Sequence, residues 1–354
     1  MDPSTITIRP LDPKAATAAE WQAIHTLANR IRAERSPDDP PETLEDIAGW
    51  YRHAPPSAGL RVWVAWRGGE AVGRVTAWLN KGTGNEHMAW LEGEVLPEWR
   101  RQGLGRRLLG TAAAAAQADN RTLVILETVS TIPAGAAFAA RLGAEVGLET
   151  HTNLLALADL DPRLLAAWLA PDPARAGFEL IGWDGPTPEE YLADMAALVN
   201  GVDNLSPRGT LQVEDEQVTP AHVREWEQTN AALGHIVWTL MVREPRQDWR
   251  LGAVAGYTGV RWNPRQPTIL RQQGTIVWPQ YQGHGLGRWL KAAMLDRVLR
   301  ERPAVRFVRT DNADANAPML KINTDLGFRP YLAASVWQVP LERVLAHTDE
   351  TRET

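Results

Sequence analysis

The chain has 354 residues, which is more than one ordinary domain, so we expect two domains. Apolar residues make up 44% of the chain and charged residues 23%, and the net charge of −6 disfavours a nucleic-acid or anionic-membrane surface. No run is apolar enough to span a bilayer, no secretory leader is apparent, and there is no cysteine. We therefore expect a cytoplasmic protein with a small-molecule partner and no metal, disulfide or cysteine nucleophile. Its oligomeric state, monomer or homodimer, stays open.

The first half alternates strand and helix signals. Hydrophobic periodicity predicts a strand at 5–10, helices at 18–33 and 44–53, a β-hairpin at 60–67 and 71–79, and a strand at 88–96. A glycine-rich loop follows, and after it a helix at 104–118, a strand at 123–128, a helix at 134–142 and a strand at 153–157. The pattern indicates an α/β domain at 1–160.

The second half repeats this order after a proline-containing stretch at 161–176, which we interpret as a linker to a domain at 177–354. Strands are expected at 178–183, 235–243, 252–262, 273–278, 305–310 and 335–339, and helices at 188–199, 220–233, from 286, and at 317–326. Gly103 matches Gly285 with an offset of 285 − 103 = 182, and Leu142 matches Leu326 with an offset of 326 − 142 = 184. Two features recurring at nearly one spacing indicate a tandem repeat.

Each half has a glycine loop between a strand and a long helix. The loops read Arg100-Arg101-Gln102-Gly103-Leu104-Gly105-Arg106 and Gln282-Gly283-His284-Gly285-Leu286-Gly287-Arg288. Glycines let successive backbone N–H groups converge on one anion, and the helix that follows adds its positive end. A lone loop of this kind is often only a tight turn, but two copies in matched surroundings favour a pyrophosphate site. The motifs of P-loop kinases and of dinucleotide-binding dehydrogenases are absent.

With these loops, both halves resemble the GNAT N-acyltransferase superfamily, in a tandem arrangement like that of mycothiol synthase. The second half also carries the family's tail, from Asn316 to Phe328. The resemblance implies two tandem GNAT-type α/β domains, each with a mixed, mostly antiparallel sheet flanked by helices. It also implies acetyl-CoA as cosubstrate and direct attack by a primary amine of a small molecule in a ternary complex. The strand residues before the loops would then border the cofactor, with a backbone N–H holding the thioester oxygen: Glu94, Val95, Thr275, Ile276 and Val277.

Further roles follow from the resemblance residue by residue. Asp311 matches an acidic position that serves as base in some members, and Asn316 matches an asparagine that contacts the cofactor arm. Asn323 stands where many members have a proton-donating tyrosine, and an amide cannot act as a general acid. The CoA thiolate is then protonated by water or another group, or by Tyr331 or Tyr281 reaching in from nearby. A solvated strand-end or capping acid explains Asp311 equally well.

The first half departs further from the family. Ile132 and Ala139 replace the asparagine and the tyrosine, while Glu127 keeps the acidic strand-end position. Glu92 and Glu94 are either catalytic, acceptor-facing or simply exposed on a pleated strand. We therefore expect the second copy to be the better candidate for the working active site.

Two other functions remain open from the sequence. The loss of the tyrosine and the eroded first half also suit a non-enzymatic acyl-CoA-binding or regulatory protein. Acetylation of a peptide or protein would need an open groove. An amino-sugar acceptor would call for an acidic cleft, for which residues 214–216 are a candidate, although an exposed loop explains them as well.

Overall fold

The computed structural model describes residues 6–244 and 254–349, and the chain forms two compact units. Unit 1 consists of Met1–Thr150, Arg208–Glu214 and Leu332–Thr354, and unit 2 of His151–Pro207 and Asp215–Tyr331. The expected division at residues 160 and 177 follows the sequence repeat, whereas each compact unit also takes in segments of the other half. Thr5, Gly252 and Ala253, which were expected in strands, lie outside the described residues.

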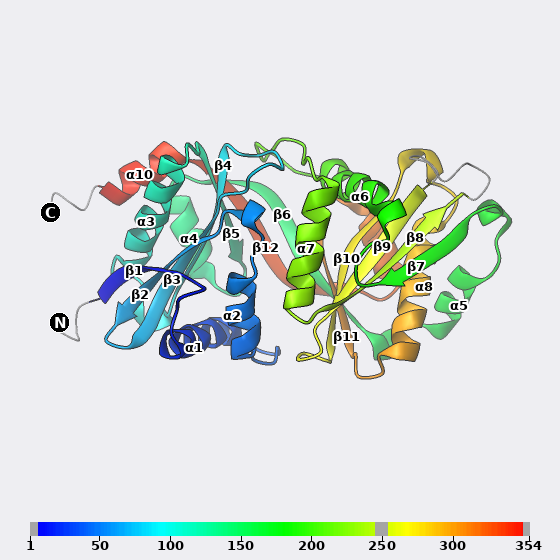
Figure 1. Cartoon of the computed structure of the whole chain (residues 1–354), viewed down its shortest axis with the longest axis horizontal. Helices are drawn as coiled ribbons and strands as arrows, with labels where there is room; N and C mark the ends of the chain where they lie inside the picture. Colours follow the sequence, from blue (N-terminus) through cyan, green and yellow to red (C-terminus); the bar gives the residue numbers. More distant parts are fainter. Residues whose placement is uncertain (1–5, 245–253, 350–354) are drawn as a thin grey trace. The chain divides into compact units, whose positions relative to one another are not determined.

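Unit 1 is a sheet with helices on both faces (Figure 1). Its strands are β1 (Ile6–Leu11), β2 (Arg61–Arg67), β3 (Glu70–Trp78), β4 (Met88–Val95), β5 (Leu123–Val129) and β12 (Arg329–Pro340), in that spatial order. Neighbouring strands are antiparallel except for the parallel pair β4 and β5. Its helices are α1 (Ala18–Arg35), α2 (Leu44–Arg52), α3 (Leu104–Ala118), α4 (Pro133–Arg141) and α10 (Leu341–Asp349), with the short 3-10 helices η1 (Pro56–Ala58) and η2 (Pro97–Trp99).

Unit 2 repeats the arrangement. Its strands follow the order β6 (Glu145–Ala156), β11 (Phe307–Ala313), β10 (Ile269–Val277), β9 (Val254–Trp262), β8 (Ile236–Arg243) and β7 (Glu179–Asp184). Strands β10 and β11 are parallel, and the pairs from β10 to β7 are antiparallel. The helices are α5 (Pro162–Leu169), α6 (Leu192–Leu205), α7 (Pro220–Ala232), α8 (Leu286–Glu301) and α9 (Ala317–Asp325), with η3 (Leu157–Asp159), η4 (Pro173–Arg175), η5 (Glu189–Tyr191) and η6 (Pro279–Tyr281).

These mixed, mostly antiparallel sheets flanked by helices confirm the expected fold class. The exchange of strands between the halves was not predicted. In unit 1, β12 lies antiparallel to β5, with Val336 opposite Glu127, and α10 packs along α3 (Figure 1). In unit 2, β6 neighbours β11, where Thr152 Oγ1 donates a hydrogen bond to Asp311. The sheet of each unit is therefore completed by a strand from the other half of the sequence.

Several elements differ from their predicted bounds. Strand β6 begins at Glu145, eight residues earlier than expected (153 − 145 = 8), and α10 was not predicted at all. The stretch interpreted as a linker contains α5, which packs against α8. Pro162 fits its first helical position because no N–H is needed there, and Asp161 caps the helix by accepting from the N–H of Arg163.

Local sequence explains why the regular elements form where they do. Helix α1 begins with a capping box in which Thr17 accepts from the N–H of Glu20, and the Glu20 carboxylate accepts from the N–H of Thr17. Its apolar residues recur at helical spacing and are buried against the sheet: Trp21, Ile24, Leu27, Ala28 and Ile31. Among the helices that the structure describes, none has both the length and the apolar character needed to cross a bilayer.

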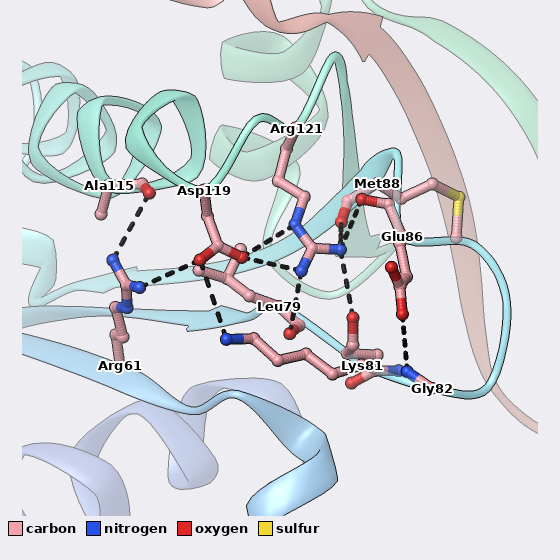
Figure 2. Close-up of polar contacts among 10 residues, drawn as sticks. Arg61, Leu79, Lys81, Gly82, Glu86, Met88, Ala115, Asp119 and Arg121 are labelled. Carbon is pink, nitrogen blue, oxygen red and sulfur yellow. Dashed lines mark hydrogen bonds and ion pairs between the residues drawn. The ribbon is translucent and has the colours of Figure 1, made fainter.

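A buried arginine fixes the connections at one end of the unit 1 sheet. Figure 2 shows the Arg121 guanidinium donating to the carbonyl oxygens of Leu79, Glu86 and Met88 and to the carboxylate of Asp119. The Arg121 side chain is only 3% exposed, so these acceptors satisfy a charge that water barely reaches. This cluster ties the start of β5 to the loop between β3 and β4, and so helps to hold β4 and β5 together at that end.

The segment Arg208–Glu214 is also fastened to unit 1. The side chain of Asn85 accepts from the N–H of Glu214 at 2.6 Å and donates to its carbonyl oxygen at 3.1 Å. Gln338 holds the same segment by accepting from the N–H of Gln212 and donating to the carbonyl of Thr210.

Candidate functional site

The first glycine loop has the geometry of an anion cradle. It follows η2, and both Arg101 (φ 63°) and the N-cap Gly103 (φ 79°) have left-handed backbone. A Cβ added to Gly103 would meet no atom within 4 Å, so the space over the loop is open. The N–H groups of Leu104, Gly105 and Arg106 stand in the first turn of α3, where a helix offers them no internal acceptor. The loop therefore presents donors and the positive end of a helix to one open space.

The second loop has the same shape. Gly283 (φ 84°) occupies the position of Arg101, and Gly285 (φ 72°) forms the N-cap of α8 as Gly103 does for α3. A Cβ at either glycine would again meet nothing within 4 Å. Leu286 is buried beneath the loop, and a Cβ on Gly287 would lie 3.4 Å from Ile322 of α9.

Several loop side chains expected near the cofactor hold the loops together. Arg100 Nε donates to the carbonyl of Val95 at 2.8 Å, and Gln282 Nε2 donates to the matching carbonyl of Val277 at 3.1 Å. Arg100 also forms a two-fold ion pair with Glu34 of α1.

The other loop side chains have their own contacts. Gln102 donates to the carbonyl of Glu98, and His284 Nδ1 lies 3.2 Å from the carbonyl oxygens of Tyr281 and Gln282. The Arg288 guanidinium lies 5.6 Å from the centre of the Trp168 ring. Together with Arg101 and Arg106, Arg288 can still add positive charge beside the loops.

A cavity of about 450 Å³ opens beside the first loop. Strands β4 and β5 pair only from Met88 to Trp90, and beyond that point the cavity occupies the space between them. The predicted site residues Glu94, Val95, Arg100, Arg101, Gly103, Gly105, Arg106 and Glu127 all line it. Most of the remaining wall is apolar, including Val75, Leu91, Leu108, Leu109, Leu126, Ile132, Phe138 and Ala139. An anion cradle at one end and an apolar channel beyond it suit a long ligand with a phosphorylated end.

Beside the cavity, Arg74 of β3 and Glu94 of β4 lie close to Tyr51 of α2. Arg74 Nε lies 2.7 Å from Glu94 Oε2, and its guanidinium lies 5.5 Å from the centre of the Tyr51 ring. The protein atoms around Glu92 raise the pKa of its carboxyl, although the side chain keeps an exposed surface, and a hydrogen bond from Trp78 opposes the shift. A carboxyl with a raised pKa that solvent can reach suits a proton acceptor.

In unit 2 the predicted catalytic residues lie on β11 and at the start of β12. The Asp311 carboxylate on β11 accepts from Thr152 Oγ1 at 2.6 Å. Tyr331 on β12 lies beneath the Arg309 guanidinium, 4.3 Å from the ring centre. Asn316 is the N-cap of α9, and its Oδ1 accepts from the N–H of Met319 at 3.4 Å.

The β10 residues expected at the cofactor lie at an irregularity of the strand. The pairing of β10 with β9 shifts between Gln272 and Thr275, and Thr275 Oγ1 lies 2.7 Å from Thr258 Oγ1. Ile276 is buried in the core of unit 2. Strands β10 and β11 pair only over Ile269–Arg271, so they part before Val277, as β4 and β5 do in unit 1.

One functional candidate was missed by sequence reasoning. Lys291 of α8 is 2% exposed, and its Nζ donates to Asn323 Oδ1 at 2.7 Å. Burial lowers the pKa of Lys291 to about 7. The signal was present in the sequence, because Lys291 stands one helical turn before Leu295 and next to Leu290, within the apolar stripe of the helix.

Comparisons with known proteins agree with this geometry. The model of the acetyltransferase (GNAT) family matches residues 21–144, within unit 1. A tandem GNAT protein from the clavulanic acid biosynthesis pathway, solved without acetyl-CoA, is 30% identical over 95% of this chain and 99% of its own, with a TM-score of 0.77. The chain belongs to the GNAT acetyltransferase family. As a tandem GNAT protein it is an acyltransferase, which confirms the resemblance noted in its sequence.

More distant GNAT structures share the fold alone. A GCN5-related N-acetyltransferase from Sphaerobacter thermophilus is 13% identical and covers 96% of both chains, with a TM-score of 0.63. The glucosamine N-acetyltransferase region of a fungal multi-domain GH3 β-N-acetylglucosaminidase is 12% identical, with a TM-score of 0.62 over 96% of this chain and 38% of that one. No curated protein sequence matches the chain.

Proposed function

We propose that this GNAT protein transfers the acetyl group of acetyl-CoA to a primary amine of a small molecule. The observation that carries the proposal is the cavity of unit 1, which joins the first glycine loop to the gap between β4 and β5. The amine attacks the thioester directly in a ternary complex, because a chain without cysteine offers no thiol for an acyl-enzyme. A cytoplasmic location completes the proposal and rests on the sequence alone.

In unit 1, backbone and side-chain groups around the cavity bind acetyl-CoA, the acetyl donor. The N–H groups of Leu104, Gly105 and Arg106 bind the pyrophosphate, with Arg101 adding charge. The backbone of β4 from Gly93 to Val95, which has no β5 partner there, offers an N–H to the thioester oxygen as negative charge develops. The arm of the cofactor lies along the apolar wall.

Two carboxylates are placed to take the proton of the amine. Glu127 lines the cavity, and Glu92 lies on the neighbouring strand with a raised pKa. Either can accept a proton as nitrogen attacks, and the raised pKa favours Glu92. In unit 2, Asp311 keeps the corresponding role that its sequence position suggested.

Glycine substitutions test the donor site of each unit. Gly103→Glu puts a carboxylate over the first loop and should abolish acetyl-CoA binding to unit 1, and Gly285→Glu should do the same for unit 2. Gly68→Glu and Gly185→Glu are matched controls, because these glycines also have positive φ (59° and 73°) and open surroundings but lie outside the loops. Titration calorimetry with acetyl-CoA measures affinity and stoichiometry.

Turnover is followed as CoA release with a panel of primary amines. The parent and both control variants should release CoA with at least one amine, and Gly103→Glu should release less. Binding without release on any amine would favour a non-enzymatic acyl-CoA-binding protein. Unchanged acetyl-CoA affinity in both loop variants would refute the proposed donor site.

A further inference from the structure

Two positions on α8 and α9 of unit 2 are polar, whereas the corresponding positions on α3 and α4 of unit 1 are apolar. Lys291 corresponds to Leu109 (291 − 182 = 109), and Asn323 corresponds to Ala139 (323 − 184 = 139). Both Leu109 and Ala139 line the cavity of unit 1. The polar pair of unit 2 therefore occupies positions that, in unit 1, face the space beside the parted strands.

A chain of hydrogen bonds fixes the Lys291 side chain. Lys291 Nζ donates to Asn323 Oδ1 at 2.7 Å, and Asn323 Nδ2 donates to Asn312 Oδ1 at 2.8 Å. Asn153 of β6 donates to the same Asn312 oxygen at 3.3 Å. Because each amide is oriented by the next, the network holds the Asn323 oxygen toward the ammonium group.

The buried ammonium group of Lys291 has fewer hydrogen-bond acceptors than it needs if its role is only structural. An ammonium carries three donors, and within residues 6–244 and 254–349 Asn323 Oδ1 is the one hydrogen-bond acceptor that Lys291 contacts. The nearest aromatic contact, the Phe328 ring, lies 5.6 Å from Nζ. Burying an ammonium with one acceptor is costly, so a ligand that brings a negative atom next to Nζ would be stabilised there.

Thioester aminolysis produces such an atom. As the amine nitrogen bonds to the carbonyl carbon, the C–S bond breaks and the sulfur leaves with the electron pair as a thiolate. The second glycine loop and the parted strands β10 and β11 would place the thioester of a bound acyl-CoA on the side of the sheet that α8 and α9 cover. Asp311 of β11, next to Asn312 in the chain, would accept the proton from the amine.

We propose that unit 2 is a second transfer site in which Lys291 protonates the departing CoA thiolate. The balance is complete: the new amide nitrogen gives its proton to Asp311, and the sulfur takes one from Lys291 Nζ to leave as CoA. Both side chains then return to their starting states by exchange with solvent. The inference rests on acetyl-CoA as the donor, which the proposed function supplies, and concerns a different unit from the cavity.

The protonation state of Lys291 suits this role. Burial lowers its pKa to about 7, and among the residues that the structure describes no charged group adds to the shift. An acid with a pKa near neutrality is protonated often enough to donate and gives up its proton readily. We expect transfer by unit 2 to fall as the pH rises through about 7, because the donor form of Lys291 is then lost.

The first experiment measures transfer in the Gly103→Glu protein, where unit 1 is blocked. Lys291→Met in that background should lower kcat at least about 100-fold and remove the alkaline fall of the rate, while acetyl-CoA affinity changes little. Lys321→Met is the matched control, because Lys321 is an exposed lysine of α9 paired with Asp325, and its rate should stay unchanged. Loss of all transfer in Gly103→Glu, or a Lys291→Met rate within about twofold of its parent, overturns the proposal.

A chemical rescue separates catalysis from packing. Because the chain has no cysteine, Lys291→Cys introduces one thiol, which 2-bromoethylamine converts to an aminoethyl side chain close to lysine in length. Labelling is done on the unfolded chain before refolding. The unlabelled protein should be as slow as Lys291→Met, and the aminoethylated protein should regain most of the rate. If circular dichroism shows that both proteins are folded, equal rates before and after labelling would argue against Lys291 as a proton donor.

A binding measurement decides the role of Lys291 even if no amine in the panel is accepted. In the Gly103→Glu protein, CoA should bind about tenfold more tightly than desulfo-CoA, because only CoA presents sulfur to Lys291. Lys291→Met should bind the two equally. Equal affinities in the protein that retains Lys291 would overturn the inference, whereas an absence of turnover in the parent would count against the proposed function instead.

Discussion

Glu92 combines a raised pKa with a surface that solvent reaches, and at the scale of single residues this makes it the leading candidate for the general base of unit 1. Its pKa lies above the ordinary value of 4.5. The carboxylate form is therefore lost as the pH falls through a value above 4.5, and transfer by unit 1 should fall with it. Above that window the base is ionised and the rate should be level with respect to this group.

Glu92→Gln tests this role. We expect it to lower kcat about 100-fold with little change in acetyl-CoA affinity, since an amide cannot accept the proton. Glu127→Gln is the matched change on the cavity wall and should have the smaller effect. The measurement is kcat against pH in the Gly285→Glu background, where unit 2 is blocked. A larger loss in Glu127→Gln than in Glu92→Gln would assign the base to Glu127.

Residues differ in how far the sequence alone could place them. Gly103 and Gly285 were predictable because a left-handed N-cap above an open space favours glycine, and that requirement is local. The role of Lys291 depends on what packs around it, namely Asn323 from α9 and Phe328 beyond that helix, which lie more than 30 residues away in the chain. A lysine in an apolar helix stripe signals burial, but only the fold shows what it contacts.

At the scale of elements, close contact between β9 and β10 shapes the cofactor side of unit 2. A Cβ added to Gly256 would lie 2.2 Å from the carbonyl oxygen of Ile276 on the neighbouring strand, and backbone cannot yield as a side chain can. On the same strand, a Cβ added to Gly259 would have no neighbour closer than 3.7 Å, the nearest being the Trp238 carbonyl oxygen. Comparing alanine substitutions at these two glycines therefore distinguishes a steric clash at Gly256 from the general effect of replacing a strand glycine by alanine.

We expect Gly256→Ala to destabilise unit 2 by about 3 kcal/mol and to weaken acetyl-CoA binding there, because β10 must shift at Ile276 and Val277. Gly259→Ala should leave stability nearly unchanged. Urea unfolding followed by tryptophan fluorescence measures both changes. Equal unfolding midpoints for the two variants would show that β10 moves freely, and the strand would then not be held in place by this contact.

Element types followed from periodicity more reliably than element partners. The amphipathic pattern of α1 and the alternation in β2 and β3 are local, and both gave elements close to their predicted bounds. The early start of β6 and the pairing of β12 with β5 have no local signal, because any apolar strand can lie beside another. The repeat in the sequence favoured pairing within each half, and the exchange of β6 and β12 departs from that expectation.

At the scale of the whole molecule, the exchange makes unit 1 depend on the end of the chain. Residues 334–340 pair with β5 along its length, and α10 follows them. Val339, Leu341 and Val344 from this segment are almost fully buried in the core that also contains α3 and the cavity wall. Without them, β5 would be an open sheet edge and an apolar surface of α3 would face water.

A fragment of residues 1–160 should therefore fail to fold, although the sequence repeat marks it as a domain. A matched protein that joins residues 1–150 to 332–354 through a glycine- and serine-rich linker regains the strand and the helix, and should unfold cooperatively and bind acetyl-CoA. Circular dichroism on heating, gel filtration and calorimetry compare the two. If residues 1–160 unfolded with the same midpoint as the joined protein, the C-terminal segment would be dispensable. The expected difference would instead mean that deleting either half of the sequence also unfolds the unit formed by the other half. Activity must then be assigned to each unit with the loop variants, and not with separate halves.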